Sequence, residues 1–201
     1  KFGARKVLFF GSSCMYPKNS NEPLKESQLF SGDLESTSIG YATAKYAGIQ
    51  ICKAINIQTN ASSFIPVVPN SAYGPNDNFD LSSSHVLSAL IRRMHEAKEN
   101  NSGEVILWGS GSPKREFIFV DDIVKACIKL ITIELNNEML PINIGVGSDI
   151  SIKKLADKIS KIVEYSGKII WDESKPDGAS RKLLDNSKIK ALGWKQEVAL
   201  D

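Results

Sequence analysis

The apolar positions of this chain alternate between short continuous runs and segments with helical spacing. The runs at residues 6–10 and 61–68 stop at Gly11 and Pro69, which is typical of buried parallel strands that end in loops. Residues 41–56 lie between them and predict a helix, because apolar side chains recur there at Ala44, Ala47, Ile51 and Ala54. This part of the chain therefore predicts a strand, a helix and a second strand.

The rest of the chain continues the alternation. Residues 69–84 are polar and predict a loop, and residues 109–111 predict a turn. We expect strands at residues 105–108, 117–120, 141–144 and 168–171. We expect helices over residues 85–99, from an N-cap at Asp121 and Asp122 to about Ile133, and from an N-cap at Ser151 to about Val163.

This order of elements predicts an α/β protein with a parallel sheet. In open sheets of this class, ligands bind beyond the carboxyl ends of the strands, where residues 11–14 and 69–74 lie in this chain. The sequence contains no strand followed by a glycine-rich phosphate turn of the GxGxxG type. The part of a nucleotide site that such a turn would form is therefore not expected here.

Composition narrows the class of protein further. The 201 residues are 42% hydrophobic and 24% charged, as in ordinary globular proteins, and the net charge of +2 is too small for a nucleic-acid footprint. We see no apolar run long enough for a membrane span and no signal peptide, so we expect a soluble cytoplasmic protein. The cysteines Cys14, Cys52 and Cys127 lack the spacing of a zinc site, so free thiols and no metal are expected.

Tyr41 and Lys45 are the first candidates for chemistry. They are four residues apart on a predicted helix, so both side chains project from one face. A phenol is a poor acid-base catalyst at neutral pH until a nearby cation favours its anion, and Lys45 carries such a charge. Taken alone, the pair is more typical of an exposed helix surface. Gly11-Ser-Ser-Cys14 adds hydroxyls and a thiol at the carboxyl end of the preceding strand.

Ser12, Tyr41 and Lys45, in this order and context, resemble the catalytic set of the extended short-chain dehydrogenase/reductase family. Within it, the chain is similar to the GDP-L-fucose synthases. The similar segments run from one end of the chain to the other: residues 11–17, 41–45, 73–79, 84–85, 108–111, 115–117, 120–122 and 174–178. The resemblance implies the carboxy-terminal part of a Rossmann-type parallel sheet plus a smaller α/β substrate-binding domain. It places residues 1–80 and 117–145 in the Rossmann part, and mainly residues 81–116 and 146–201 in the substrate-binding domain.

The same resemblance implies roles for the catalytic residues. Epimerisation beside a ketone needs a base and an acid on opposite faces of the sugar. Cys14 would be the base and His85 the acid, while Ser12 and Tyr41 would hydrogen-bond the keto oxygen. Tyr41 would then protonate that oxygen as NADPH delivers hydride. A cysteine buried as a small hydrophobe and a structural histidine are the alternatives for each residue taken singly.

Binding residues also follow from the resemblance. It assigns NADP(H) to Phe10, Gly11, Ser12, Ser13, Lys45, Pro69, Asn70, Ser71, Ala72 and His85. It assigns the GDP-sugar substrate, GDP-4-keto-6-deoxymannose, to Arg93, Trp108, Arg115 and Lys175. For Arg93 the alternative is a solvated helix face, and for Trp108 it is core packing. The segment that is usually Pro-Thr-Asn-Leu in this family is Pro69-Asn-Ser-Ala72 in this chain.

These assignments predict epimerisation at C3 and C5 and NADPH-dependent reduction at C4 of the GDP-sugar, in an enzyme that forms a homodimer. The glycine-rich part of the cofactor site lies outside this sequence, so we expect the chain alone to bind NADPH weakly and to be nearly inactive. Two alternatives stay open. One is another sugar-nucleotide epimerase, dehydratase or reductase of the family, and the other is a non-catalytic GDP-sugar-binding subunit.

Overall fold

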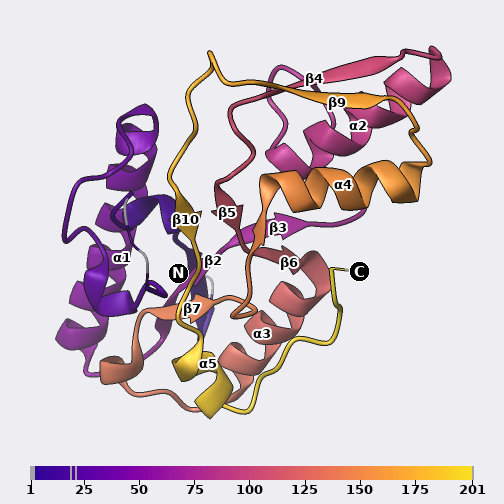
Figure 1. Cartoon of the computed structure of the whole chain (residues 1–201). Helices are drawn as coiled ribbons and strands as arrows, with labels where there is room; N and C mark the ends of the chain where they lie inside the picture. Colours follow the sequence, from indigo (N-terminus) through magenta and orange to yellow (C-terminus); the bar gives the residue numbers. More distant parts are fainter. Residues whose placement is uncertain (1–2, 19, 21, 201) are drawn as a thin grey trace.

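The computed structural model describes residues 3–18, 20 and 22–200. Its central sheet is parallel, in the order β1-β2-β7, and consists of β1 (Val7–Phe10), β2 (Phe64–Pro69) and β7 (Ile142–Ile144). The register pairs Phe10 with Val67 and Val67 with Ile142. The structure thus confirms the predicted α/β class and its parallel sheet (Figure 1).

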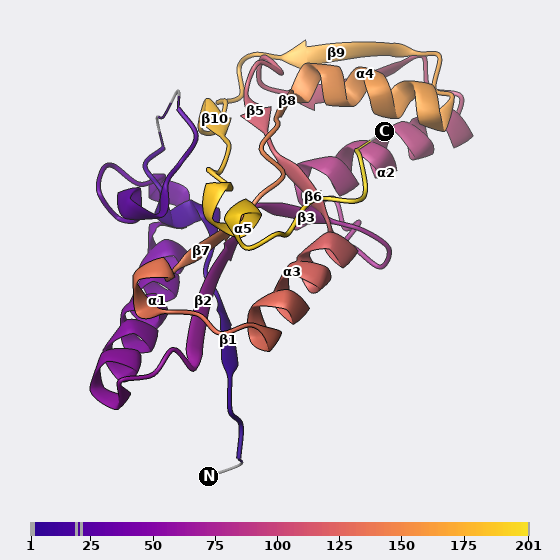
Figure 2. The ribbon, with the colours of Figure 1, turned by 90° about the horizontal axis from the view of Figure 1, so that it is seen from below.

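The two faces of this sheet are covered by different helices. α1 (Ile39–Thr59) lies on one side of the strands and α3 (Val120–Thr132) on the other (Figure 2). Side chains alternate along β2, so that Val67 packs with the α3 cluster and Val68 with the α1 cluster. Both valines are fully buried, which explains the continuous apolar run in the sequence.

A second group of elements has its own hydrophobic cluster. It combines α2 (Val86–Glu99) and α4 (Ile152–Val163) with the parallel strands β4 (Glu104–Trp108) and β9 (Lys168–Asp172). These elements lie together at the upper right of Figure 1, apart from the central sheet. Their buried side chains include Leu90, Met94, Leu107, Leu155 and Ile159. The exact boundaries of the two predicted domains stay a prediction.

Several short elements were not predicted. The expected loop over residues 69–84 contains β3 (Ser71–Tyr73), which pairs in parallel with β6 (Phe117–Phe119), so that part of the prediction was wrong. Strands of two or three residues have too few positions to show an alternation. The other short elements are β5 (Lys114–Arg115), β8 (Ile150–Ser151), β10 (Arg181–Lys182), α5 (Ser187–Ala191) and the 3-10 helices η1 (Ser13–Met15), η2 (Glu26–Gln28), η3 (Ser36–Ser38) and η4 (Asn137–Met139).

One of the two predicted helix caps is confirmed. The Ser151 side chain accepts a hydrogen bond from Lys154 N at 3.2 Å and caps α4. The cap predicted at Asp121 and Asp122 was wrong, because α3 begins at Val120 and its N-cap is Phe119. Buried Asp122 instead accepts the backbone N–H groups of Glu197 and Val198 from the last segment of the chain. The local pattern assigned the Asp122 carboxylate to the start of α3, but the carboxylate instead bonds to a segment that is distant in the sequence.

The α1 helix buries a face other than the one marked by the apolar spacing. Its buried residues are Ala42, Ile49, Cys52 and Asn56. The regularly spaced residues Ala44, Ala47, Ile51 and Ala54 are all exposed, and Ile51 keeps 60% of its surface accessible. The helix therefore carries a second apolar stripe that faces away from the sheet.

Candidate active site

The end of β1 is fixed against β2 before the predicted catalytic residues begin. Gly11 N donates to Val67 O at 2.8 Å. A Cβ atom on Gly11 would lie 2.8 Å from Met15 Cε and 3.3 Å from Val67 O, so only glycine fits without displacing its neighbours. The chain then turns into η1, and the Ser12 hydroxyl caps this turn by accepting from Cys14 N at 3.2 Å. Because that bond uses an acceptor site, the Ser12 O–H proton stays available as a donor.

Tyr41 and Lys45 bring the start of α1 to the same strand end. Lys45 Nζ donates to Phe10 O at 2.9 Å and lies 5.7 Å from the centre of the Tyr41 ring. Tyr41 is 53% exposed, so its phenol is accessible to a ligand. The pair is therefore more than two neighbours on a helix surface, because the ammonium group joins the helix to the strand end. We call Phe10, Ser12, Cys14, Tyr41 and Lys45 the strand-end site.

The predicted cofactor segment 69–72 contains one side chain that packs inward. Asn70 is 5% exposed, and its amide donates to the Glu116 carboxylate and to Lys182 O while accepting from Ser71 N. Both N–H groups of this amide are used and the side chain is almost wholly buried, so a contact between the amide and a cofactor would require the side chain to move. The predicted cofactor contact of Asn70 is therefore restricted to its backbone, while Ser71 and Ala72 lie in β3.

Glu116 is the residue of this region that the sequence analysis missed. Its carboxylate is fully buried and accepts Gly147 N at 2.7 Å and Leu184 N at 3.0 Å in addition to the Asn70 amide. Burial raises the pKa of Glu116 above its ordinary value, although these hydrogen bonds act against that rise. An acidic residue directly before two buried apolar residues, Phe117 and Ile118, was the available signal.

The predicted substrate residues Trp108 and Lys175 lie together. Lys175 Nζ is 5.8 Å from the centre of the Trp108 ring, a distance typical of a cation–π contact. Trp108 is 69% exposed at the end of β4, so the core-packing alternative for this residue was wrong. An exposed indole beside an ammonium group offers a flat surface and a positive charge to the same ligand.

Two loops that are distant in sequence hold this pair. The Asp177 carboxylate accepts Ser110 N at 3.0 Å and the Ser110 hydroxyl at 2.7 Å. Gly109 has φ of +80°, and a Cβ atom there would lie 2.2 Å from Asp177 Oδ1. The similar segments at residues 108–111 and 174–178 therefore meet through a contact that depends on glycine.

Arg115 contacts the end of the loop that carries Lys175 and Asp177. Its guanidinium donates to Ala179 O and to Lys114 O, both at 2.7 Å. Burial lowers the pKa of Arg115, and the nearby carboxylates of Glu35 and Asp177 oppose that change. We call Trp108, Ser110, Arg115, Lys175 and Asp177 the loop site.

His85 and Arg93 belong to neither group by direct contact. His85 is the exposed N-cap residue of α2, and its backbone oxygen accepts Ala89 N and the Ser88 hydroxyl. Arg93 is half-buried on α2, whereas the adjacent Arg92 pairs with Glu96 at 2.6 Å. In the ranges that the structure describes, no hydrogen bond or ion pair joins Cys14 to His85. Their pairing as base and acid stays a prediction.

The three cysteines are free thiols, as predicted. Among the described residues, no group of three or more histidine, cysteine, aspartate or glutamate side chains could hold a metal ion. A search of the same residues found no helix with the length and apolar character needed to cross a membrane.

Comparisons with known proteins agree with this geometry. Residues 1–145 match the model of the NAD dependent epimerase/dehydratase family. The chain is 50% identical over 196 residues to "Probable GDP-L-fucose synthase 1" of Oryza sativa subsp. japonica, covering 98% of this chain and 59% of the relative. It is 46% identical to the GDP-L-fucose synthase of Escherichia coli (strain K12), covering 98% and 63%. The chain therefore spans about 60% of the length of these curated relatives.

Solved structures give the same fold over nearly the whole chain. A GDP-6-OMe-4-keto-L-xylo-heptose reductase from C. jejuni superposes with a TM-score of 0.86 at 38% identity, covering 98% of this chain and 67% of that one. A GDP-L-fucose synthetase from Naegleria fowleri bound to NADP superposes with a TM-score of 0.85 at 26% identity, covering 98% and 63%. Because the family model matches residues 1–145, which is more than half of the chain, and the strand-end site is in place, this chain belongs to the NAD dependent epimerase/dehydratase family.

Proposed function

We propose that the protein of which this chain is part epimerises C3 and C5 of GDP-4-keto-6-deoxy-D-mannose and reduces C4, producing GDP-L-fucose. The observation that carries the proposal is the strand-end site, where Lys45 joins Tyr41 to the end of β1 just before Ser12 and Cys14. Curated relatives named GDP-L-fucose synthase match 98% of the chain at 46% to 50% identity, which supports this choice of substrate.

The proton transfers can be assigned to the chain's own residues. Cys14 removes a proton from the carbon beside the keto group, and His85 returns one to the opposite face. The Ser12 hydroxyl and the Tyr41 phenol donate to the keto oxygen and stabilise the charge that develops on it. During the reduction Tyr41 passes a proton to this oxygen, and the Lys45 ammonium stabilises the phenolate left behind.

NADPH is the cofactor that this site fits at its nicotinamide end, and it supplies the hydride for C4. Lys45 uses one N–H on Phe10 O, so two further donors are available to a ribose hydroxyl. Ser12, Ser13 and the backbone of residues 69–72 complete the proposed contacts. The buried Asn70 amide contributes only by holding this backbone in place.

The loop site is the proposed position of the GDP part. Lys175 carries a positive charge beside an exposed indole, and Arg115 adds a second cation behind the loop. A nucleoside diphosphate presents a flat base and several anionic oxygens, and the two features match these groups. Arg93 on α2 is the remaining proposed substrate contact.

We further propose a cytoplasmic homodimer that pairs through α1. The exposed stripe of Ala44, Ala47, Ile51 and Ala54 is apolar, and its three alanines allow a second helix to approach closely. Introducing a charge with Ile51→Lys is expected to shift the molar mass measured by light scattering toward the monomer. Ile162→Lys is the matched control, because Ile162 is an exposed isoleucine on α4 rather than on α1. An unchanged mass for Ile51→Lys would reject this interface.

The activity is tested first by binding and then by isotope incorporation. In calorimetric titrations of the 201-residue chain, we expect GDP to bind and NADPH to bind weakly. A polypeptide of the relatives' full length that carries this sequence is then mixed with the keto sugar and NADPH in deuterated water. Deuterium at C3 and C5 together with NADPH oxidation supports the proposal.

Variants separate the steps of this reaction. Cys14→Ser is expected to abolish deuterium incorporation while hydride transfer persists, and Cys127→Ser on α3 is the control thiol. NADPH oxidation by the unmodified protein without any deuterium incorporation would instead identify a simple reductase of the same family. GDP-sugar binding without any turnover would identify a binding subunit.

A further inference from the structure

A buried polar network lies directly behind the segment that carries Cys14. Cys14 is the middle residue of η1 and is half-buried. The next two residues are in the core, because Met15 is 0% exposed and Tyr16 is 3% exposed. The position of the thiol therefore depends on what holds these two residues.

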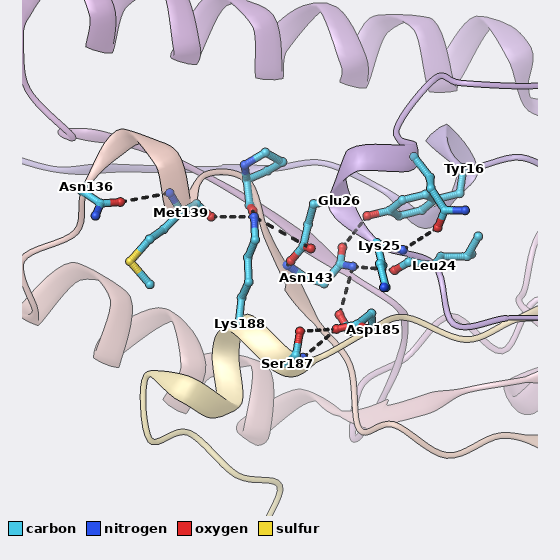
Figure 3. Close-up of polar contacts among 12 residues, drawn as sticks. Tyr16, Leu24, Lys25, Glu26, Asn136, Met139, Asn143, Asp185, Ser187 and Lys188 are labelled. Atoms are coloured by element: carbon cyan, nitrogen blue, oxygen red, sulfur yellow. Dashed lines mark hydrogen bonds and ion pairs between the residues drawn. The ribbon is translucent and has the colours of Figure 1, made fainter.

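Tyr16 is held by an asparagine that lies 127 positions later in the chain. Its hydroxyl donates to Asn143 Oδ1 at 2.6 Å, and Asn143 is the central residue of β7. Figure 3 shows the two side chains pointing toward each other between the η1 segment and β7. Burial, followed by the nearby Glu26 charge, raises the pKa of Tyr16 well above its usual range. The hydroxyl therefore keeps its proton and remains a donor.

Asn143 cannot turn away from Tyr16, because its other polar groups are used. Its Nδ2 donates to Leu24 O at 2.9 Å and to Asp185 O at 3.1 Å, which fixes Oδ1 as the acceptor for Tyr16. Its backbone N donates to Glu26 Oε1 at 3.0 Å. All of these groups lie in one buried network, which Figure 3 shows as a chain of dashed lines.

The far side of the network is held as well. Glu26 Oε2 lies 3.9 Å from Lys188 Nζ, and this ammonium donates to Met139 O at 3.1 Å and to Pro141 O at 3.3 Å. The Glu26 carboxylate therefore contacts both the backbone of β7 and Lys188 of α5, and these two contacts hold it in place. The network spans η2, β7 and α5, so its geometry is set by the fold rather than by one loop.

The other residues of the strand-end site also have supports outside this network. Ser12 follows Gly11, whose backbone is bonded to β2, and Tyr41 and Lys45 lie on α1. Cys14 lies two residues before Tyr16, with the buried Met15 between them. Its N–H bonds to the Ser12 hydroxyl, and its side chain packs against the cluster that contains Met15 and Tyr16. Loosening Tyr16 would therefore move the thiol while the keto-oxygen donors stay in place.

From these contacts we infer that Tyr16 and Asn143 are positioning residues that aim the Cys14 thiol at the sugar carbons. This inference rests on the proposed function for the role of Cys14, but the placement of the thiol does not. Removing the Tyr16 hydroxyl separates epimerisation from reduction, because only epimerisation uses the thiol.

The first test needs no substrate. The rate at which iodoacetamide alkylates Cys14 is measured by peptide mapping for the unmodified chain and for Tyr16→Phe. We expect alkylation to become about threefold faster or more, because the half-buried thiol is released. The control is Tyr165→Phe, which removes another buried tyrosine hydroxyl, bonded to Ser102 O at 3.2 Å in the α2/α4 region. A Cys14 rate that is the same in all three proteins overturns the inference.

The second test uses the reaction. In the full-length enzyme, Tyr16→Phe is expected to lower deuterium incorporation relative to NADPH oxidation by about tenfold or more, whereas a general loss of stability would lower both equally. An unchanged ratio overturns the inference. If Tyr16→Phe does not fold, Asn143→Ser gives the same comparison, because its shorter side chain cannot reach the Tyr16 hydroxyl. If the unmodified enzyme shows no epimerisation, the proposed function fails while the alkylation rates still decide whether this network places Cys14.

Discussion

The strand-end site and the loop site are built in opposite ways. In the strand-end site, the reactive groups extend from backbones that are fixed elsewhere: Phe10 is paired with Val67 in the sheet, and Lys45 lies on a long helix. In the loop site, the polar groups hold one another, as Asp177 does with Ser110 and Arg115 with Ala179. We therefore expect substitutions in the first site to change chemistry with little loss of stability. In the second site, substitutions that break the contacts between the loops should change binding and local structure together.

The largest expected effect is on chemistry in the strand-end site. Lys45→Met removes the ammonium beside Tyr41 but keeps most of the side-chain stem. Hydride transfer is expected to fall roughly 100-fold to 10,000-fold, because the phenolate of Tyr41 loses its cation. The free energy of unfolding should fall by only about 1 kcal/mol, for the lost bond to Phe10 O.

Single-turnover NADPH oxidation and urea unfolding measure the two effects of this substitution. Lys53→Met on the same helix is the control, because Lys53 is also half-buried. Equal activities of the Lys45→Met and Lys53→Met variants would contradict the assignment of Lys45.

The next largest effect is on stability, at the buried Glu116 carboxylate. Glu116→Ala leaves the N–H groups of Gly147 and Leu184 and the Asn70 amide without their acceptor. We expect the free energy of unfolding to fall by about 3 kcal/mol, measured from urea midpoints. The control is Glu99→Ala at the exposed end of α2. A loss as small as that of the control would mean that water replaces the carboxylate.

The contact between the two loops gives a smaller combined effect. Gly109→Ala places a Cβ atom against Asp177 and forces a side chain into φ of +80°. We expect a loss of about 1–2 kcal/mol in stability and a weaker affinity for GDP, measured by calorimetry. Gly103→Ala is the matched control, because nothing lies within 4 Å of its added Cβ. Weaker GDP binding by both variants would rule out a specific role for this contact.

Removing the exposed indole should affect binding alone. Trp108→Ala is expected to weaken GDP binding by about 0.5–1 kcal/mol, through loss of the flat surface beside Lys175. Its stability should stay within about 0.5 kcal/mol, because the side chain is exposed. Ile106→Ala is the control, since Ile106 is 52% exposed two residues earlier on the same strand. Unchanged GDP affinity would remove Trp108 from the loop site.

The smallest effect concerns pH. The pKa of Glu116 is raised in the folded state, so the folded protein binds this proton more tightly than the unfolded chain does. The resulting stabilisation is fully present below the ordinary pKa of 4.5 and is lost as pH rises through the folded value. The free energy of unfolding of the unmodified chain relative to Glu116→Gln should therefore decline over that window. Urea unfolding at several pH values measures this difference, and parallel curves would contradict the raised pKa.

The parts of this molecule that the sequence predicted are those with local patterns. The apolar runs of β1, β2 and β4 and the cap of α4 at Ser151 each lie within a few neighbouring residues, and they were predicted. The parts that were missed depend on contacts between distant segments. The Asp122 carboxylate was assigned to a helix end but bonds to residues 197–198. The exposed stripe of α1 has the same spacing as a buried one, so the sequence pattern alone does not show which stripe faces the sheet.

The candidate site likewise has a part that was predicted from the sequence and a part that was not. Tyr41, Lys45 and the strand end were identified from spacing and resemblance, and the structure places them in contact. The resemblance assigned Asn70 to the cofactor, yet its amide is occupied by Glu116, 46 positions away in the sequence. Neither residue type nor spacing indicates that pairing. Buried hydrogen-bond partners of this kind are fixed by packing, which the linear pattern does not encode.

The hydrogen bonds of Asn143 also determine at which edge the central sheet can accept another strand. β7 is the last strand on its side, and the Glu26 carboxylate already occupies the backbone N–H of Asn143 on this strand. Another strand could not pair there without displacing a buried charge. In the described part of the chain, β1 forms the opposite border of the sheet. Any strand that extends this sheet, from the same polypeptide or from another, must therefore add beside β1.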